Sequence, residues 1–302
     1  MYDLVIIGAG WAGFNAALRA KELGLTVCLI DSNQLGGTCL NYGCIPTKTL
    51  IASAKIFSLA KKSASFGVEL NQPVLNWAAI QSKKDKVVFA LKLGMQSKLA
   101  GIDFINSSAL IISAQEVKVE GRIIKAKFIL IATGSRPIQL PQLPFDGEKI
   151  ITSDQALVLP QIPQSLLVVG GGVIGCEFAS LFYVLGSSVT IVEKTPTLLP
   201  VEDREVSRKM EPIFKKKGIK VVTGADASAL DLENYSKVLV CVGRTPQVEG
   251  LGLDGLGIEL KNNSIVVDDY LKSSLDNIYA AGDCTAKVML AHYAAYQGVL
   301  AV

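Results

Sequence analysis

Two closely spaced cysteines are the residues of this chain best suited to covalent chemistry. Cys39 and Cys44 stand in the run Gly-Gly-Thr-Cys-Leu-Asn-Tyr-Gly-Cys-Ile-Pro-Thr-Lys, which ends at Lys48. Such a pair is either a dithiol that cycles with a disulfide or half of a zinc site, and a zinc site needs two further ligands at similar spacing. The remaining cysteines stand singly, and the chain has one histidine, His292. The dithiol is therefore favoured, and the single cysteines are interpreted as small buried residues: Cys28, Cys176, Cys241 and Cys284.

The residues after the pair indicate how a thiolate would be favoured. Pro46 predicts that a helix begins near it, since proline suits a first helical turn. The amino end of a helix lowers the pKa of a nearby thiol. Lys48 would lie on the same helical face as Cys44 and would favour the thiolate, the alternative being an ordinary surface lysine.

A glycine-rich turn near the start of the chain predicts a nucleotide site. A strand over 4–7, a helix over 14–23 and a strand over 26–30 form a βαβ unit whose first turn is G-x-G-x-x-G. The first glycine allows the tight turn, the second lets the backbone approach a pyrophosphate, and the third lets helix and strand pack closely. The amino end of the helix offers N–H groups and a positive dipole to the phosphates. These residues are Gly8, Gly10 and Gly13, and Asp31 ends the second strand, where it can accept hydrogen bonds from a ribose.

The same unit recurs later in the chain, which indicates an internal duplication. A strand over 166–169, a helix over 176–185 and a strand over 188–192 surround a second G-x-G-x-x-G. Gly170, Gly172, Gly175 and Glu193 follow their counterparts at a constant offset, 170 − 8 = 162. One such turn is a weak signal, but two with equal flanking elements predict two dinucleotide sites. Because a carboxylate there favours a free 2′-hydroxyl and repels a 2′-phosphate, Glu193 predicts NAD rather than NADP.

Composition and charge disfavour several classes of partner. The chain has 302 residues, half of them hydrophobic, which suits a large core in two domains. Its formal net charge of +3 gives no case for nucleic acid or an anionic membrane. No apolar run approaches the ~18 residues of a membrane span. The first residues already read as a strand, so we expect no leader segment and a cytoplasmic protein.

A lysine-rich stretch is interpreted as a helix with one side in water. Its predicted wet side carries Lys83, Lys84, Lys86, Lys92 and Lys98, and its predicted apolar side carries Val87, Val88, Leu91 and Met95.

Taken together, these motifs resemble those of the class I pyridine nucleotide–disulfide oxidoreductases. The cysteine run resembles the redox-active motif of that family in the form closest to the dihydrolipoamide dehydrogenases, and the resemblance covers essentially the whole chain. Four shorter motifs agree with it: Ala132-Thr133-Gly134, Val242-Gly243-Arg244-Thr245-Pro246, Ala280-Ala281-Gly282-Asp283 and Met289-Leu290-Ala291-His292.

The resemblance implies a role for each motif. The first glycine turn with Asp31 would hold the ADP part of FAD, and the second with Glu193 would hold NAD. Cys44 would be the thiolate against the flavin and Cys39 the thiol that meets substrate. Lys48 and Glu177 would form an ion pair near the flavin N5. The other implied cofactor-binding residues are Gly37, Thr38, Thr133, Gly134, Gly243, Arg244, Gly282, Asp283 and Ala291, with no metal ligand among them.

The implied fold is α/β, with two nested Rossmann-like dinucleotide-binding domains. The FAD domain would comprise residues 1–146 and 271–302, and the inserted NAD domain residues 147–270.

The chain departs from the family pattern in two places. The family's base is a histidine in a His-Pro motif of a C-terminal dimerisation domain, and this chain has no His-Pro before its end at Val302. We therefore expect that domain to be absent, the isolated chain to be incomplete, and a homodimer for the intact enzyme. His292 matches a different family position and is interpreted as a core-facing or flavin-edge residue. The stretch 222–238 is also short, since the family carries more β-structure there.

The expected function is electron transfer between a dithiol or disulfide and NAD, through Cys39, Cys44 and FAD. The resemblance points to dihydrolipoamide, free or on a lipoyl domain. Alternatives are a glutathione- or mercuric-type reductase, which Glu193 disfavours because those enzymes use NADPH, and a soluble transhydrogenase. A truncated flavin-binding remnant without full turnover is a further alternative.

Overall fold

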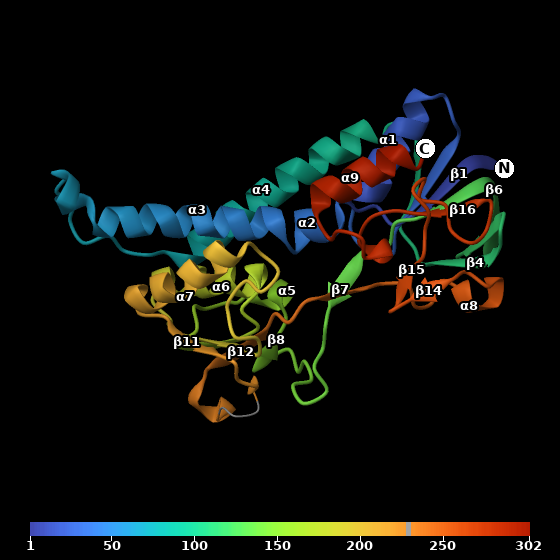
Figure 1. Cartoon of the computed structure of the whole chain (residues 1–302). Coiled ribbons are helices and arrows are strands. Elements are labelled where there is room, and N and C mark those ends of the chain that lie inside the picture. The colour runs from blue at the N-terminus through green and yellow to red at the C-terminus, as the bar shows by residue number, and fades with distance from the viewer. Residues whose placement is uncertain (228–230) are drawn as a thin grey trace. The chain divides into compact units, whose positions relative to one another are not determined.

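The computed structural model describes residues 1–227 and 231–302, which fold as two compact units. The first unit holds residues 1–41, 88–136 and 244–302, and the second holds residues 42–87 and 137–243. Each unit contains a sheet with parallel strands joined through helices (Figure 1). The predicted α/β class with two Rossmann-like parts is thus confirmed. The domain boundaries 1–146, 147–270 and 271–302 stay a prediction.

The first unit is built on a sheet with the strand order β3-β2-β1-β6-β5-β4, and β16 also pairs with β6. The strands are β1 (Tyr2–Ile7), β2 (Val27–Ile30), β3 (Asp103–Ile105), β4 (Ala109–Ser113), β5 (Glu116–Val119), β6 (Arg122–Ile131) and β16 (Ile278–Ala280). The pairs among β1, β2, β3, β6 and β16 are parallel, whereas β4, β5 and the start of β6 pair in antiparallel fashion. Every residue of β2 is apolar and buried, as expected for a parallel strand covered on both faces.

Two helices lie side by side in this unit, α1 (Trp11–Glu22) and α9 (Ala291–Leu300) (Figure 1). A Cβ on Gly298 would stand 2.0 Å from the carbonyl oxygen of Ala12, so only a glycine permits this approach. The shorter elements are α2 (Gly37–Asn41), α8 (Leu253–Leu256), η4 (Asp283–Thr285) and the paired short strands β7 (Ser135–Pro137) with β13 (Arg244–Pro246) and β14 (Leu260–Lys261) with β15 (Ser264–Ile265).

The second unit has a parallel sheet in the order β11-β10-β9-β12-β8. Its strands are β8 (Ile150–Ile151), β9 (Ser165–Val169), β10 (Ser188–Glu193), β11 (Lys220–Thr223) and β12 (Lys237–Val240). Its helices are α3 (Cys44–Lys61), η1 (Ser63–Phe66), α5 (Ser153–Ala156), α6 (Val173–Leu185), α7 (Arg204–Lys217) and η3 (Leu232–Asn234).

The core of the second unit gathers around α6. Phe178 and Phe182 are buried with their rings stacked at a centroid distance of 6.2 Å, and Leu50 and Ala54 of α3 belong to the same apolar cluster. This packing fixes α3 against α6, and it therefore sets the position of the residues at the amino end of α3.

The lysine-rich helix, α4 (Trp77–Lys98), begins within the second unit and ends within the first. Two predictions about its faces are wrong. Lys84 is buried rather than in water, because its Nζ donates to the carbonyl oxygen of Leu157 at 3.0 Å and pairs with Asp85 at 3.1 Å. Leu91, predicted to be on the apolar side, is exposed. A buried ammonium is tolerated when it is paired and hydrogen-bonded, and no sequence pattern shows that such partners are present.

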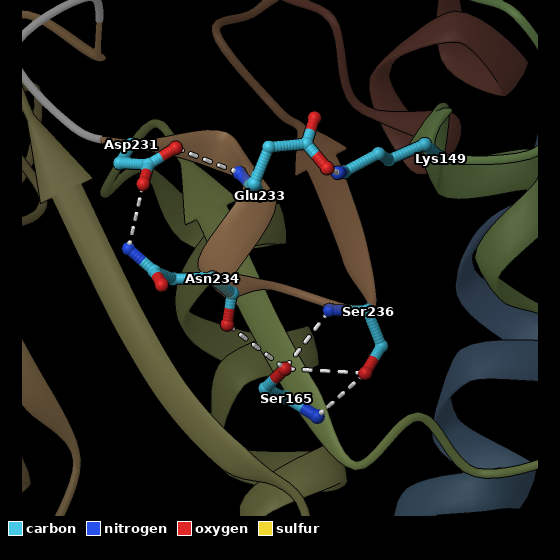
Figure 2. A network of polar contacts seen from close by, with 6 residues as sticks. All are labelled: Lys149, Ser165, Asp231, Glu233, Asn234 and Ser236. Atoms are coloured by element: carbon cyan, nitrogen blue, oxygen red, sulfur yellow. Dashed lines mark hydrogen bonds and ion pairs between the residues drawn. The ribbon is translucent and has the colours of Figure 1, made fainter.

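A polar network holds the segment before β12 in the second unit. Ser165 and Ser236 exchange backbone and hydroxyl hydrogen bonds, and Lys149 pairs with Glu233 at 2.7 Å (Figure 2). The stretch 222–238, predicted to be short, includes residues 228–230, which lie outside the described residues. In its described part η3 lies between β11 and β12, and the polar contacts tie this connection to β9.

Three helices begin two or three residues earlier than predicted, because each starts directly after a glycine that serves as its N-cap. The N-cap residues of α1, α3 and α6 are Gly10, Gly43 and Gly172, so each helix starts directly after a glycine. The third glycines, Gly13 and Gly175, lie inside the first turns rather than before them. Helix α3 accordingly starts at Cys44, two residues before Pro46.

Candidate functional site

The first glycine turn leaves one position open for a ligand. Gly8 has φ of +110° and a Cβ there would stand 2.2 Å from the carbonyl oxygen of Ala132, while one on Gly13 would stand 1.8 Å from the carbonyl oxygen of Gly8. Both positions therefore require glycine for the fold itself. Gly10 differs, because its φ is −72° and the nearest atom to its Cβ would be the Cα of Gly37 at 3.8 Å. The fold does not demand a glycine at this position.

The second turn, in the other unit, repeats this arrangement. A Cβ on Gly170 would stand 2.4 Å from the carbonyl oxygen of Cys241, and one on Gly175 would stand 2.0 Å from that of Gly170. Gly172 has φ of −71°, and a Cβ there would meet nothing within 4 Å. In both turns the second glycine thus keeps a space clear at the start of a helix.

The helices that follow these turns suit an anion. Gly10 and Gly172 provide no side-chain cap, and the first turns of α1 and α6 hold no acidic residue. Their backbone N–H groups and helix dipoles favour a phosphate. The chain therefore fits a dinucleotide pyrophosphate in each unit.

The two strand-ending acids make matching contacts, each within its own unit. Asp31 accepts from the backbone N–H of Ala9 at 2.6 Å and of Asn33 at 2.7 Å. Glu193 accepts from the N–H of Gly171 at 2.6 Å and from the N–H of Thr195 at 2.7 Å. Each acid thus braces its glycine turn.

The two carboxylates differ in how many donors they already have. The hydroxyl of Thr195 adds a third hydrogen bond to the Glu193 carboxylate at 2.8 Å, whereas the Asp31 carboxylate accepts two, both from backbone N–H groups, within the described part of the chain. A carboxylate offers about four acceptor sites, so both acids keep capacity for ribose hydroxyls. Binding of ribose by either acid stays a prediction.

Two segments of the first unit are joined by polar contacts around Thr133 and Gly134. The hydroxyl of Thr133 donates to the carbonyl oxygen of Gln247 at 2.6 Å, and the N–H of Gln247 donates to the carbonyl oxygen of Gly134 at 3.0 Å. Arg136 and Glu249 form an ion pair next to them, with nitrogen–oxygen distances of 2.5 and 2.7 Å. The Ala-Thr-Gly motif and the segment after Arg244 therefore form one polar assembly.

A second polar cluster lies beside this assembly in the first unit. The hydroxyl of Ser135 donates to Asp283 at 2.6 Å and accepts from Nε of Arg244 at 2.8 Å. Arg244 also reaches the hydroxyl of Thr38 at 3.4 Å. Two predicted site residues from distant parts of the sequence, Asp283 and Arg244, thus meet at Ser135, which was not itself among the predicted site residues.

The backbone before Asp283 is held by the buried side chain of Gln297. The N–H of Gly282 donates to Oε1 of Gln297 at 2.8 Å, while Nε2 of that amide is buried with no partner among the described residues. Helix α9, which carries Gln297, starts at Ala291 without a side-chain cap. This part of the first unit therefore offers hydrogen-bond donors that suit a polar group such as a flavin.

The six cysteines differ in how far they are buried. Burial raises the pKa of the Cys28 thiol to about 11 and those of Cys176 and Cys284 to about 12, so these thiols stay protonated at neutral pH. Cys241 is only half-buried, so its interpretation as a buried residue is wrong. Cys44 is exposed, and it is the first residue of α3.

Cys39 is half-buried and lies in α2. It belongs to the first unit and Cys44 to the second, so the pairing of the two cysteines stays a prediction.

An ion pair joins α3 to α6 in the second unit. Nζ of Lys48 lies 2.7 Å from Oε1 and 2.9 Å from Oε2 of Glu177. Lys48 is one helical turn after Cys44, so a positive charge and the amino end of α3 both lie near that thiol along the helix.

His292 is exposed, so the core-facing interpretation of this residue is wrong.

The predicted site residues are distributed over both units. The first unit holds Gly8, Gly10, Gly13, Asp31, Gly37, Thr38, Cys39, Thr133, Gly134, Arg244, Gly282, Asp283 and Ala291. The second unit holds Cys44, Lys48, Gly170, Gly172, Gly175, Glu177, Glu193 and Gly243.

The two turns, the acids and the cysteine run define a two-dinucleotide oxidoreductase, and comparison with known proteins agrees. The chain belongs to the pyridine nucleotide–disulphide oxidoreductase family, whose profile matches residues 2–298. It is 40% identical over 321 residues to a dihydrolipoyl dehydrogenase of Bacillus subtilis (strain 168), covering 99% of this chain and 70% of that protein. It is 38% identical over 319 residues to a dihydrolipoyl dehydrogenase of Chlamydia pneumoniae, covering 99% and 69%.

A solved structure is also similar to this chain. The HOCl-induced flavoprotein disulfide reductase RclA from Escherichia coli matches with a TM-score of 0.86 and 30% identity, covering 98% of this chain and 69% of that one. The predicted class is therefore confirmed: the chain is a dihydrolipoyl dehydrogenase-like, NAD-dependent disulfide oxidoreductase of a flavoprotein family that uses FAD and NAD. Within residues 1–227 and 231–302, every helix is too short or too polar to span a bilayer.

Sequence reasoning missed three residues that hydrogen-bond to predicted site residues. Ser135 had a usable signal, because it directly follows Ala132-Thr133-Gly134. Thr195 stands two residues after Glu193, where an acid commonly accepts from the backbone. Gln297 had no local signal, since its partner Gly282 lies 15 residues away.

Proposed function

We propose that this chain serves in an enzyme that transfers two electrons between NADH and a disulfide of the lipoamide type. The reaction is NADH + H⁺ + disulfide → NAD⁺ + dithiol, and it runs in the opposite direction when dihydrolipoamide is the donor. The observation that carries this proposal is that a Cβ at Gly10 or Gly172 would meet no atom closer than 3.8 Å. Each of these glycines precedes a helix whose amino end has no side-chain cap, and each glycine turn is hydrogen-bonded to an acid, Asp31 or Glu193. Because the fold itself does not demand these two glycines, a ligand in each unit explains them.

The proposal assigns the first unit to FAD and the second to NAD. Gly10 and Asp31 would bind the pyrophosphate and ribose of FAD, and Asp283 a hydroxyl of its ribityl chain. Gly172 and Glu193 would bind the corresponding groups of NAD. Bound FAD supplies a carrier that takes up two electrons from one partner and delivers them to the other.

The cysteine pair would perform the exchange with substrate. A thiolate at Cys39 attacks the substrate disulfide, whose S–S bond breaks as a mixed disulfide forms. The Cys44 thiolate then attacks Cys39, which releases the second substrate sulfur and leaves Cys39 and Cys44 oxidised. Each departing substrate sulfur takes a proton from solvent. The start of α3 and the charge of Lys48 support this proposal because both favour a thiolate at Cys44.

Substrate preference gives the first test of the proposal. Lipoamide is proposed from the names of the relatives, and NADH from the charge of Glu193 beside its glycine turn. Steady-state assays of the FAD-loaded chain should give kcat/KM values at least about tenfold higher for NADH than for NADPH. They should also favour lipoamide over glutathione disulfide. A preference for NADPH with glutathione disulfide would contradict the proposal. A lipoyl domain as substrate carrier and a homodimer of the whole enzyme are parts of the same proposal.

The ion pair of Lys48 and Glu177 provides a second test. Both side chains are partly exposed, so Glu177→Gln should change stability by less than about 1 kcal/mol. Flavin reduction by NADH, followed by stopped-flow absorbance, should nevertheless slow by about tenfold or more, because Lys48 loses the partner that orients it. Lys48→Met should have a similar effect.

A matched control for this test exists in the same unit. Lys149 and Glu233 also form an ion pair at 2.7 Å, remote from the glycine turn in sequence (Figure 2). Glu233→Gln should leave flavin reduction unchanged. Equal rates in Glu177→Gln and Glu233→Gln would show that the Lys48 pair is only structural.

A further inference from the structure

Ser135 lies where three distant segments of the first unit meet. It is only 6% exposed and stands on the short strand β7. Its Oγ lies 2.6 Å from Oδ2 of Asp283 and 2.8 Å from Nε of Arg244. A buried hydroxyl thus stands between a carboxylate and a guanidinium.

The direction of these hydrogen bonds follows from the chemistry of the groups. A guanidinium can only donate, so Oγ of Ser135 accepts from Arg244. The single hydroxyl proton is then left for Asp283, which accepts it as a carboxylate. Both hydrogen bonds involve an ionised group and are stronger than neutral ones, and in a chain each polarises the other.

This chain of hydrogen bonds fixes the orientation of the Asp283 carboxylate. Ser135 occupies Oδ2, and Oδ1 keeps its lone pairs for another donor. Arg244 is held in turn by the carbonyl oxygen of Ser135 at 2.7 Å. The backbone N–H of Gly282, next to Asp283, is fixed by the buried amide of Gln297. Arg244 and Asp283, at the two ends of this series of hydrogen bonds, are therefore both held in place.

We propose that Ser135 is a positioning residue that presents one oxygen of Asp283 to a hydroxyl of the flavin's ribityl chain, and that Arg244 acts on FAD binding through Ser135. This inference rests on the proposed function, in which Asp283 binds FAD. It changes the predicted role of Arg244 from a direct cofactor contact to a residue that orients its neighbours.

Loss of the Ser135 hydroxyl has a definite consequence. In Ser135→Ala, Asp283 loses its donor and Nε of Arg244 loses its acceptor at the same time. The two opposite charges are then expected to turn toward each other, which moves the carboxylate from the orientation that suits a ribityl hydroxyl. FAD affinity should fall although Asp283 itself is intact.

The test is FAD binding to the refolded or deflavinated full chain, measured by quenching of flavin fluorescence. Ser135→Ala should raise the Kd for FAD by about tenfold, as expected for a lost hydrogen bond to a charged group. Ser135→Thr keeps the hydroxyl and suits a strand, so it should bind FAD within about threefold of the parent. Ser273→Ala is the matched control, because it removes a buried hydroxyl of the same unit whose hydrogen bonds, among the described residues, are to the backbone of Leu275. It should leave FAD affinity unchanged.

A double-mutant cycle separates positioning from general loss of stability. If Ser135 acts through Asp283, Ser135→Ala should change the Kd by less than about twofold in an Asp283→Ala background. An equal effect of Ser135→Ala in both backgrounds, or no effect in the parent, would overturn the inference. If Asp283→Ala itself leaves FAD affinity unchanged, the proposed flavin site fails instead. The two failures are therefore distinguishable.

Discussion

Replacing Gly172 by alanine is expected to weaken NADH binding by on the order of 100-fold and to leave the fold almost as stable as before. The backbone at Gly172 is extended, and the added methyl would meet no protein atom within 4 Å. The stability cost should stay below about 1 kcal/mol, as for an alanine at a helix N-cap. The methyl would stand where a pyrophosphate must approach the backbone, and the loss of two charge-assisted hydrogen bonds accounts for the expected effect on affinity. Isothermal calorimetry with NADH and thermal unfolding measure the two quantities.

Two other glycines serve as controls for this prediction. Gly10→Ala should impair FAD binding and spare stability in the same way, since its methyl would make only an ordinary contact with Gly37. Gly175→Ala should instead destabilise the fold by about 1–3 kcal/mol or more, because its Cβ would overlap the carbonyl oxygen of Gly170. If Gly172→Ala binds NADH normally, the second turn is not a nucleotide site.

Cys44→Ser is expected to lower disulfide reduction by on the order of 10³-fold or more, because the covalent route through a thiolate is removed. Reduction of bound flavin by NADH should persist, since neither glycine turn contains Cys44. Activity with a one-electron acceptor such as ferricyanide should therefore stay within about threefold of the parent. Paired assays with lipoamide and ferricyanide separate the two half-reactions.

Cys241→Ser is the matched control for the cysteine prediction. Cys241 is half-buried in the second unit and stands outside the Cys39–Cys44 run. Its replacement should spare both activities. Lipoamide reduction that survives Cys44→Ser would show that another group performs the exchange.

Much of the fold could be predicted from the sequence because its signals are local. The strands of each βαβ unit were predicted to within about two residues at either end, since buried parallel strands are short, continuous apolar runs. The helix starts were placed too late, because Gly13 and Gly175 were taken as turn residues. They lie inside the helices, where the absence of a side chain permits close contact with Gly8 and Gly170.

The parts of the candidate site that depend on hydrogen bonds between residues far apart in the sequence could not be predicted. The glycines, acids and cysteines come in spaced motifs, so they could be named in advance. Ser135 gains its importance only from Asp283 and Arg244, which lie 148 and 109 residues away in the chain. Lys84 likewise looked like a surface lysine, because its carbonyl partner on Leu157 lies 73 residues away.

The central claim is that FAD, the NAD site and the cysteine pair operate as one electron path, and anaerobic titration of the FAD-loaded chain with NADH tests it most directly. We predict a long-wavelength absorbance band after uptake of two electrons, as a thiolate at Cys44 comes to lie against oxidised flavin. The band should be absent from the NADH titration of Cys44→Ser. Bleaching of the flavin without the band in the parent chain, or failure of NADH to reduce the flavin, would contradict the account.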